Sequence, residues 1–172
     1  SLTAVNSAGS AANIQALGAG TADFAILQGL YGSYAATGTG PISEKQENLR
    51  AITMLWQNVE QFIISDDYAK TGTVADLVAL KGESAGMGKQ NSGTLGSNKV
   101  LLAGLGIDID TDFRLVYSGY GPTADALVNE QIEIAGIPSG TPTGAITKLM
   151  AANHDRFAIL NVTEAQAKKM DA

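Results

Sequence analysis

The stretch GMGKQNSGT, residues 86–94, has the glycines, lysine and hydroxyl side chains that nucleotide-binding loops use. A phosphate-binding P-loop requires a glycine, four residues and then Gly-Lys-Ser/Thr, so that backbone N–H groups surround the phosphates and a hydroxyl reaches Mg²⁺. Glu83 stands where the first glycine is needed, and Gln90 follows Lys89 in place of the hydroxyl residue. The dinucleotide pattern G-x-G-x-x-G also fails, because Asn91 occupies the third glycine position. The sequence therefore predicts no nucleotide site.

The same polar residues lie where a helix is expected to begin. Leucines recur at seven- and three-residue spacings from Leu95 onward, which predicts a helix with one apolar side over 94–104. Unpaired N–H groups and the positive end of the dipole at such a start suit an anion. Asn91 or Ser92 could instead simply cap the helix. Taken alone, the local sequence favours capping.

Residues that could form a catalytic set are scattered through turns. The string GIPSG resembles a nucleophile elbow, but Pro138 stands where G-x-S-x-G needs serine. The only histidine, His154, lies in a polar turn, where a solvated or capping role is expected. The carboxylates of Asp66, Asp67 and 107–112 fit turns better than an acid–base pair or a cation site. We expect no enzyme activity, no metal site and no cofactor.

Composition limits the class of partner. The chain has 172 residues, 45% of them hydrophobic, which is enough to bury the core of one domain or two small ones. A net charge of −6 argues against nucleic acid, whose binding proteins usually present clustered Lys and Arg. The absence of cysteine excludes thiol catalysis and disulfides, and no apolar run in the sequence is long enough to cross a bilayer.

Strand and helix patterns alternate along most of the chain. Strands are expected at 2–7, 23–29, 83–88, 113–119, 133–139 and 157–162. Helices are expected at 11–20, 94–104, 122–130, 142–153 and 163–170, the last opening with a capping box of Thr163 and Gln166. A Gly/Thr-rich stretch at 34–47 is expected to be a loop or a short turn of helix. This alternation predicts an α/β fold with a parallel or mixed sheet that helices cover on both faces.

Five loops share one composition, and most of them follow expected strands. Each combines glycine with hydroxyl side chains, which lets backbone N–H groups approach a ligand and supplies neutral hydrogen bonds. The loops are 6–13, 27–34, 89–94, 117–123 and 137–143. Ligands of α/β sheets gather beyond the carboxyl ends of the strands. The five loops therefore predict a polar small-molecule pocket.

Three blocks of the sequence resemble the TAXI-type solute-binding subunits of TRAP transporters. They are SAGSAANIQALGAGTADFAILQG, VADLVALKGESAGMGKQNSGT and YSGYGPTADALVNEQIEIAGIPSGTPTGAITKL. The blocks occur in the order of that family and with suitable gaps, so the resemblance covers nearly the whole chain. Ala8, Asn91 and Glu133 depart from it, because the family usually has Gly, Gly and Asp there.

The resemblance implies a type II periplasmic-binding-protein fold, in which two α/β lobes close on a ligand. It also implies a periplasmic or extracytoplasmic protein that delivers a small carboxylate, such as glutamate or a dicarboxylate, to TRAP membrane subunits. To the contacts that it carries over we add Lys89, the one cation of the five loops, and Tyr117. The expected ligand-binding residues are then Gly9, Ser10, Gln28, Tyr31, Lys89, Ser92, Gly93, Thr94, Tyr117 and Pro138.

Compared with that family the chain looks short, as if it lacked N- and C-terminal segments. We expect part of a first lobe at 1–67, a complete second lobe at 68–162, and the start of a return to the first lobe at 163–172. An incomplete lobe exposes sheet edges, which favours dimers or swapping. Two alternatives stay open: an ABC-type binding protein for nitrate, sulfonate or a thiamine precursor, and a sensory ligand-binding domain.

Overall fold

The chain folds into two compact units in a computed structural model that describes residues 1–171. Unit 1 consists of Ser1–Leu55 together with Lys89–Gly96, and unit 2 of Trp56–Gly88 together with the chain from Ser97 onward. The chain thus passes between the units three times, the last time inside one helix. The lobe boundaries expected at residues 67 and 162 stay a prediction, although residues 56–67 belong to unit 2 by their contacts.

Unit 2 is built on a five-stranded mixed sheet with the order β3-β2-β4-β1-β5. The strands are β1 (Phe62–Ser65), β2 (Ser84–Gly86), β3 (Arg114–Leu115), β4 (Ile134–Gly136) and β5 (Phe157–Ile159). β2 runs parallel to β3 and β4, whereas β1 runs antiparallel to β4 and β5. The mixed sheet predicted from the alternating pattern is therefore confirmed.

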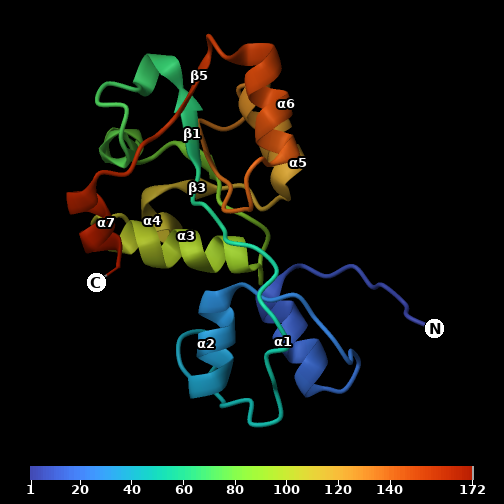
Figure 1. The fold of residues 1–172 in the computed structure, drawn as a ribbon. Helices are drawn as coiled ribbons and strands as arrows, with labels where there is room; N and C mark the ends of the chain where they lie inside the picture. The colour runs from blue at the N-terminus through green and yellow to red at the C-terminus, as the bar shows by residue number, and fades with distance from the viewer. Residues whose placement is uncertain (172) are drawn as a thin grey trace. The chain divides into compact units, whose positions relative to one another are not determined.

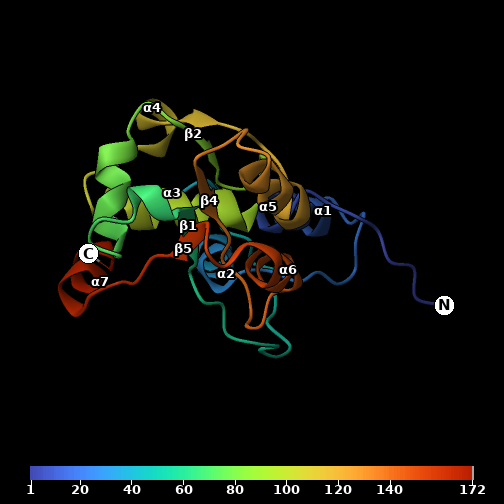
Figure 2. The same cartoon turned by 90° about the horizontal axis from the view of Figure 1, so that it is seen from above.

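Helices cover both faces of this sheet. On one face α5 (Tyr120–Val128) and α6 (Gly144–Asn153) lie side by side (Figure 1, Figure 2) and bury an apolar core with Ile63 and Ala135 of the sheet. On the other face Asn98 of α3 (Gly93–Ala103) is fully buried, and its Nδ2 donates to the carbonyls of Met87 and Gly136, at 3.2 Å each. This side chain fastens α3 to the carboxyl ends of β2 and β4.

The remaining elements of unit 2 are short. They are the 3₁₀ helices η1 (Asp66–Tyr68) and η2 (Val74–Leu80), and the helices α4 (Ile109–Asp112) and α7 (Glu164–Met170). The capping box predicted at the start of α7 is confirmed, with both Thr163 and Gln166 bonded as expected. Among the described residues no helix combines the length and the apolar character that a membrane span needs.

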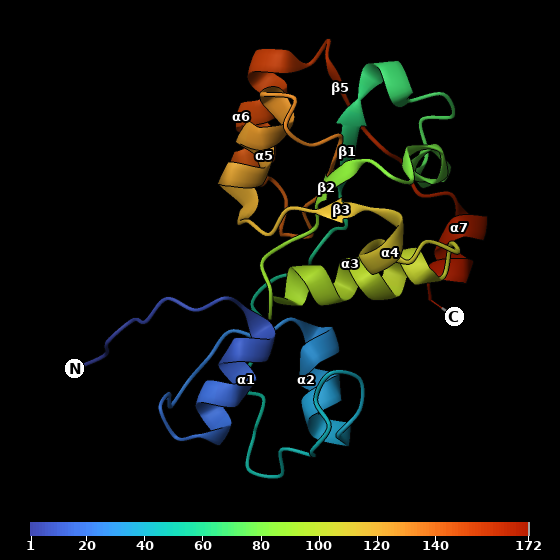
Figure 3. The same ribbon diagram turned by 180° about the vertical axis from the view of Figure 1, so that it is seen from behind.

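Unit 1 consists of two complete helices, the first residues of α3 and the loops that connect them. α1 (Ser10–Gly18) packs beside α2 (Gly29–Thr37), as Figure 3 shows. Their core contains Ala11, Ile14, Tyr31, Ala35 and Ile42. Tyr31 and Ala35 are four residues apart and therefore lie on the same side of α2.

Three predictions for this part of the chain are wrong. Residues 2–7 and 23–29 were predicted as strands, but they form no strand in the structure. No strand within residues 1–171 pairs with either segment, and a strand-like segment without a partner cannot build a sheet. Leu2 and Phe24 are consequently 90% and 68% exposed. The loop predicted at 27–34 is mostly the first part of α2, because burying one side of this segment outweighs its glycines.

Candidate functional site

The starts of three helices meet inside unit 1. The backbone N–H of Gln28, which precedes α2, donates to Ser10 Oγ at the start of α1, at 3.0 Å. Gly93, the first residue of α3, adjoins both: a Cβ added to it would lie 2.6 Å from Ser10 Oγ and 2.7 Å from Gln28 Oε1. A Cβ on Gly9 would lie 2.9 Å from the Cα of Ser92. At Gly9 the positive φ of 138° and the backbone of Ser92 require glycine, whereas a methyl group at Gly93 would have to displace the ends of two side chains.

The electrostatics of these helix starts favour an anion. Among the described residues no side chain caps the start of α1 or α2, although the N–H of Ala12 in the first turn of α1 donates to the Asn91 carbonyl at 3.4 Å. Each start carries the positive end of a helix dipole. The loops 6–13, 27–34 and 89–94 contain no acidic residue, and Lys89 is their only charged one. Together they form a positive, glycine-lined corner of unit 1.

Ser92 has a structural role in this corner. Its Oγ accepts a hydrogen bond from the backbone N–H of Leu95 at 3.1 Å and donates one to the carbonyl of Lys89 at 2.7 Å. The capping role that the local sequence favoured is therefore present. A direct contact between this hydroxyl and a ligand stays a prediction.

Gln28 and Tyr31 complete the corner. Gln28 Oε1 is buried and has no hydrogen-bond partner among the described residues, which is an uncommon state for a buried acceptor. Tyr31 is buried, and its ring meets that of Tyr34 edge to face, with centroids 5.6 Å apart. The Tyr31 hydroxyl lies beside Gly96, the last residue of unit 1 in α3.

Eight of the ten predicted ligand-binding residues thus belong to unit 1, and two belong to unit 2. Tyr117 follows β3 and is largely exposed, whereas Pro138 follows β4 and is buried. The Pro138 carbonyl accepts a hydrogen bond from the Tyr120 hydroxyl at 2.5 Å. Both residues lie beyond the carboxyl ends of parallel strands, where the sequence placed them.

The sequence reasoning missed Glu60, which lies beside Pro138 in unit 2. One carboxylate oxygen of Glu60, Oε2, is buried without a hydrogen-bond partner among the described residues. Burial raises the pKa of this carboxyl from 4.5 to about 7. The sequence did contain an indication that Glu60 is buried. In the run VEQFIIS, Glu60 is two and four residues before Phe62 and Ile64, which are both buried, so all three lie on the same face of the extended segment.

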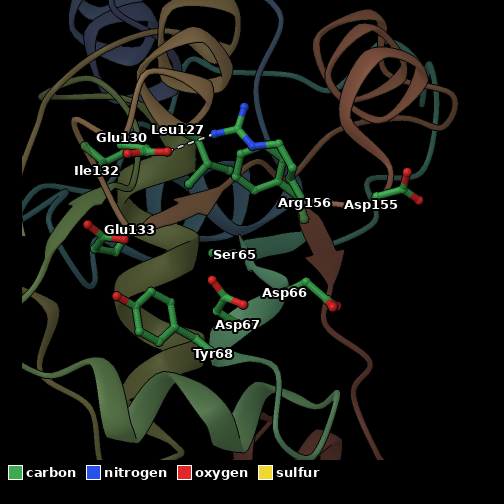
Figure 4. A pocket seen from close by; sticks show the side chains of 11 residues that line it. Ser65, Asp66, Asp67, Tyr68, Leu127, Glu130, Ile132, Glu133, Asp155 and Arg156 are labelled. Carbon is green, nitrogen blue, oxygen red and sulfur yellow. Dashed lines mark hydrogen bonds and ion pairs between the residues drawn. The ribbon is translucent and has the colours of Figure 1, made fainter.

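A cavity of about 390 Å³ opens at the amino end of β4, which is the opposite end of the same sheet. Figure 4 shows its lining, in which Arg156 pairs with Glu130 at 3.1 Å and lies over the ring of Phe157. Asp66, Asp67, Glu133 and Asp155 also line it, so its charge is negative. No group of three His, Cys, Asp or Glu side chains in the described part of the chain could hold a metal ion. This cavity lies at the amino end of β4, away from Pro138.

Comparison with known proteins identifies both a family and a fold. The sequence model of the NMT1-like family matches residues 1–172. The alkanesulfonate-binding protein SsuA from Xanthomonas axonopodis pv. citri, bound to MOPS, superimposes with a TM-score of 0.53 at 17% identity, over 91% of this chain and 48% of that one. The chain has the type II periplasmic-binding-protein fold predicted for it.

Two further structures are less similar. The aliphatic sulphonate binding protein SsuA from Escherichia coli gives a TM-score of 0.45 at 18% identity, over 59% of this chain and 31% of that one. A binding protein of an ABC phosphonate transporter from Pseudomonas aeruginosa gives 0.45 at 18% identity, over 68% and 44%. The chain thus spans between about a third and a half of the length of these proteins.

Proposed function

The chain belongs to the NMT1-like family, and from this premise we propose that it is an extracytoplasmic solute-binding protein. It captures a small carboxylate, such as glutamate or a dicarboxylate, and delivers it to membrane subunits of a transporter of the TRAP type. The TAXI-like sequence blocks support this transporter class. The protein is then associated with the membrane through those subunits, and its work is binding without catalysis.

The meeting of three helix starts in unit 1 carries this proposal. A carboxylate needs several N–H donors and a positive potential, and helix starts supply both without a full countercharge. Ser10, Gln28 and Gly93 converge from three separate segments of the chain, and no acidic residue of their loops would repel an anion. Lys89 is the one full positive charge of these loops.

The experiment that tests the proposal replaces one glycine. In a Gly93→Ala variant the new methyl group must displace the ends of the Ser10 and Gln28 side chains. We expect the affinity for glutamate and succinate, measured by titration calorimetry on the full-length protein, to fall by at least about tenfold. Gly144→Ala is the matched control, because Gly144 is also the first residue of a helix and a Cβ there would meet nothing within 4 Å.

Binding of both acids by Gly93→Ala as tightly as by the natural protein would contradict the anion site. A drop in both variants would point to a general effect of alanine at a helix start. Thermal melting of each variant separates a lost site from a lost fold.

A second candidate is an ABC-type binding protein for sulfonates. The Xanthomonas protein of the same fold binds alkanesulfonate, and a sulfonate is also an anion that uncapped helix starts can hold. Sulfonates in the same titration distinguish the two candidates.

The expected dimer or swap belongs to the proposal as well. The strand-like segments of unit 1 form no strand and expose apolar side chains, a combination that favours pairing with a second copy of the chain.

A further inference from the structure

A short strap, residues 56–61, leads the chain into unit 2 just before β1. One isolated bridge holds the strap to the sheet, because the backbones of Val59 and Ser139 exchange hydrogen bonds of 2.8 and 3.1 Å. The N–H of Ile137 also donates to the carbonyl of Gln61 at 2.9 Å. Within the described chain, residues 48–58 form no strand or bridge, so the Val59–Ser139 bridge is the end of this ladder. The end of a ladder opens at a lower cost than its middle.

The side chain of Glu60, in this strap, points to the face of the sheet that α3 covers. The bridge keeps the register of β1 with β4, in which Phe62 lies opposite Gly136. A Cβ on Gly136 would lie 2.6 Å from Asn98 Nδ2, so Asn98 of α3 covers the face to which Phe62 points. Glu60 is two residues before Phe62 and therefore points to this face as well.

This face is a poor environment for a negative charge. Phe62 and Met87 are buried there and apolar, and Met87 Sδ would lie 2.8 Å from the same added Cβ. Asn98 gives no donor to an ionised Glu60, because its Nδ2 already donates to two backbone carbonyls. Glu60 Oε2 and Asn98 Oδ1 are both buried acceptors without a hydrogen-bond partner among the described residues.

The elements packed around Glu60 bring no positive charge to it. Residues 56–65, 84–88 and 134–140 contain no charged side chain other than Glu60. The only charged residue of α3, Lys99, forms an ion pair with Asp110. On the opposite face, the hydroxyl of Tyr120 donates to the Pro138 carbonyl at 2.5 Å. Burial therefore acts on Glu60 without compensation, and it raises the pKa of this carboxyl to about 7.

We propose that Glu60 makes the strap a pH-dependent switch: the protonated carboxyl stays buried and the Val59–Ser139 bridge stays closed, whereas ionisation draws the side chain into water and opens the bridge. An unpaired charge is costly to bury, and this terminal bridge is the contact that the chain gives up most easily to expose it. Opening frees residues 56–61, so the connection from unit 2 back to residue 55 contains more unpaired residues above neutral pH than in mild acid. The inference goes beyond the proposed function and does not depend on the solute.

Hydrogen exchange of single backbone amides tests the switch in the full-length protein without ligand. The readout is the protection of the Val59 and Ser139 N–H groups, corrected for the pH dependence of exchange in free peptides. We expect this protection to be at least about tenfold lower at about pH 8 than at about pH 5, and the pKa difference of Glu60 limits the loss to about 300-fold. In Glu60→Gln the protection should change by less than about twofold, because the amide side chain does not ionise. Glu133→Gln removes another partly buried acid and should keep the pH dependence of the natural protein.

A third amide distinguishes opening of the strap from unfolding of the whole unit. The N–H of Leu160 donates to the carbonyl of Phe62 at 2.8 Å, on the side of β1 that faces β5. At about pH 8 it should stay at least about tenfold better protected than Val59 and Ser139. Equal protection of the three amides at that pH would overturn the inference, because all three would then exchange through unfolding. Constant protection of the natural protein across the pH range, or the same loss in Glu60→Gln, would also overturn it. None of these results bears on the capture of a solute by unit 1.

Discussion

At the scale of one residue, Glu60 should make the stability of the protein depend on pH, because its pKa of about 7 in the folded protein exceeds the ordinary 4.5. Between these two values the folded state binds more protons than the unfolded state, so the free energy of unfolding must fall as the pH rises. The contribution of protonated Glu60 to the free energy of unfolding is fully present below about pH 4.5 and is lost above about pH 7. The shift corresponds to at most about 3 kcal/mol.

Glu60→Gln should remove this dependence. We expect urea unfolding of the variant to show a flatter profile between pH 4.5 and 7, and a higher free energy of unfolding than the natural protein above pH 7. Glu133→Gln is the control, because Glu133 is also partly buried but lies at the other end of β4. Parallel profiles of the natural protein and Glu60→Gln would show that the carboxylate is not buried at a cost.

The sequence predicted the roles of those residues whose hydrogen-bond partners are close neighbours in the chain. The cap at Ser92 and the capping box of Thr163 depend on neighbours within four positions, and both are present in the structure. The closeness of Ser10, Gln28 and Gly93 joins three separate segments of one unit. The sequence named all three as ligand contacts but assigned Gly93 to the second lobe, because local patterns do not show which segments pack together. Glu60 was overlooked because its burial depends on pairing with residue 138, which lies far along the chain.

At the scale of elements, helices were predicted better than strands. The helices predicted from one-sided spacing are confirmed as α1, α3, α5, α6 and α7. A helix satisfies its own backbone groups, whereas a strand requires a partner that the local pattern cannot supply. The strand predicted at 113–119 is accordingly reduced to the two residues of β3, and those at 2–7 and 23–29 do not form.

The segments of unit 1 that form no strand should promote association of the chain with a second copy. Ile52 and Met54 are 75% and 91% exposed in a stretch that forms no strand, and such segments pair readily with another chain. We expect the 172-residue chain to form dimers or larger species at micromolar concentration in size-exclusion chromatography with light scattering. A double Ile52→Lys, Met54→Lys variant should shift it toward the monomer.

The control for that shift carries the same added charge elsewhere. Val78 and Val100 are exposed single side chains of unit 2, so a double Val78→Lys, Val100→Lys variant should leave the association unchanged. A natural chain that stays monomeric at every concentration, or equal effects of the two double variants, would argue against pairing through the segments of unit 1.

At the scale of the whole molecule, composition and fold are both compatible with the small-molecule partner that we propose. A net charge of −6 disfavours nucleic acid, and the fold is that of type II periplasmic binding proteins. The α/β class followed from the alternation of strand and helix patterns along the sequence, whereas the periplasmic-binding-protein fold was implied by the resemblance to a family. The class of ligand depends on a few side chains, and the helix starts of unit 1 are the ones that we propose for an anion.

The most direct test of the account is a thermal-shift screen of the full-length protein against small acids. The panel contains glutamate, glutamine, 2-oxoglutarate and succinate, with an alkanesulfonate and nitrate for comparison. A ligand that binds only the folded state raises the melting temperature with its saturation. We expect a rise with at least one of the carboxylates. A rise with the sulfonate or nitrate alone, or with no compound, would contradict it.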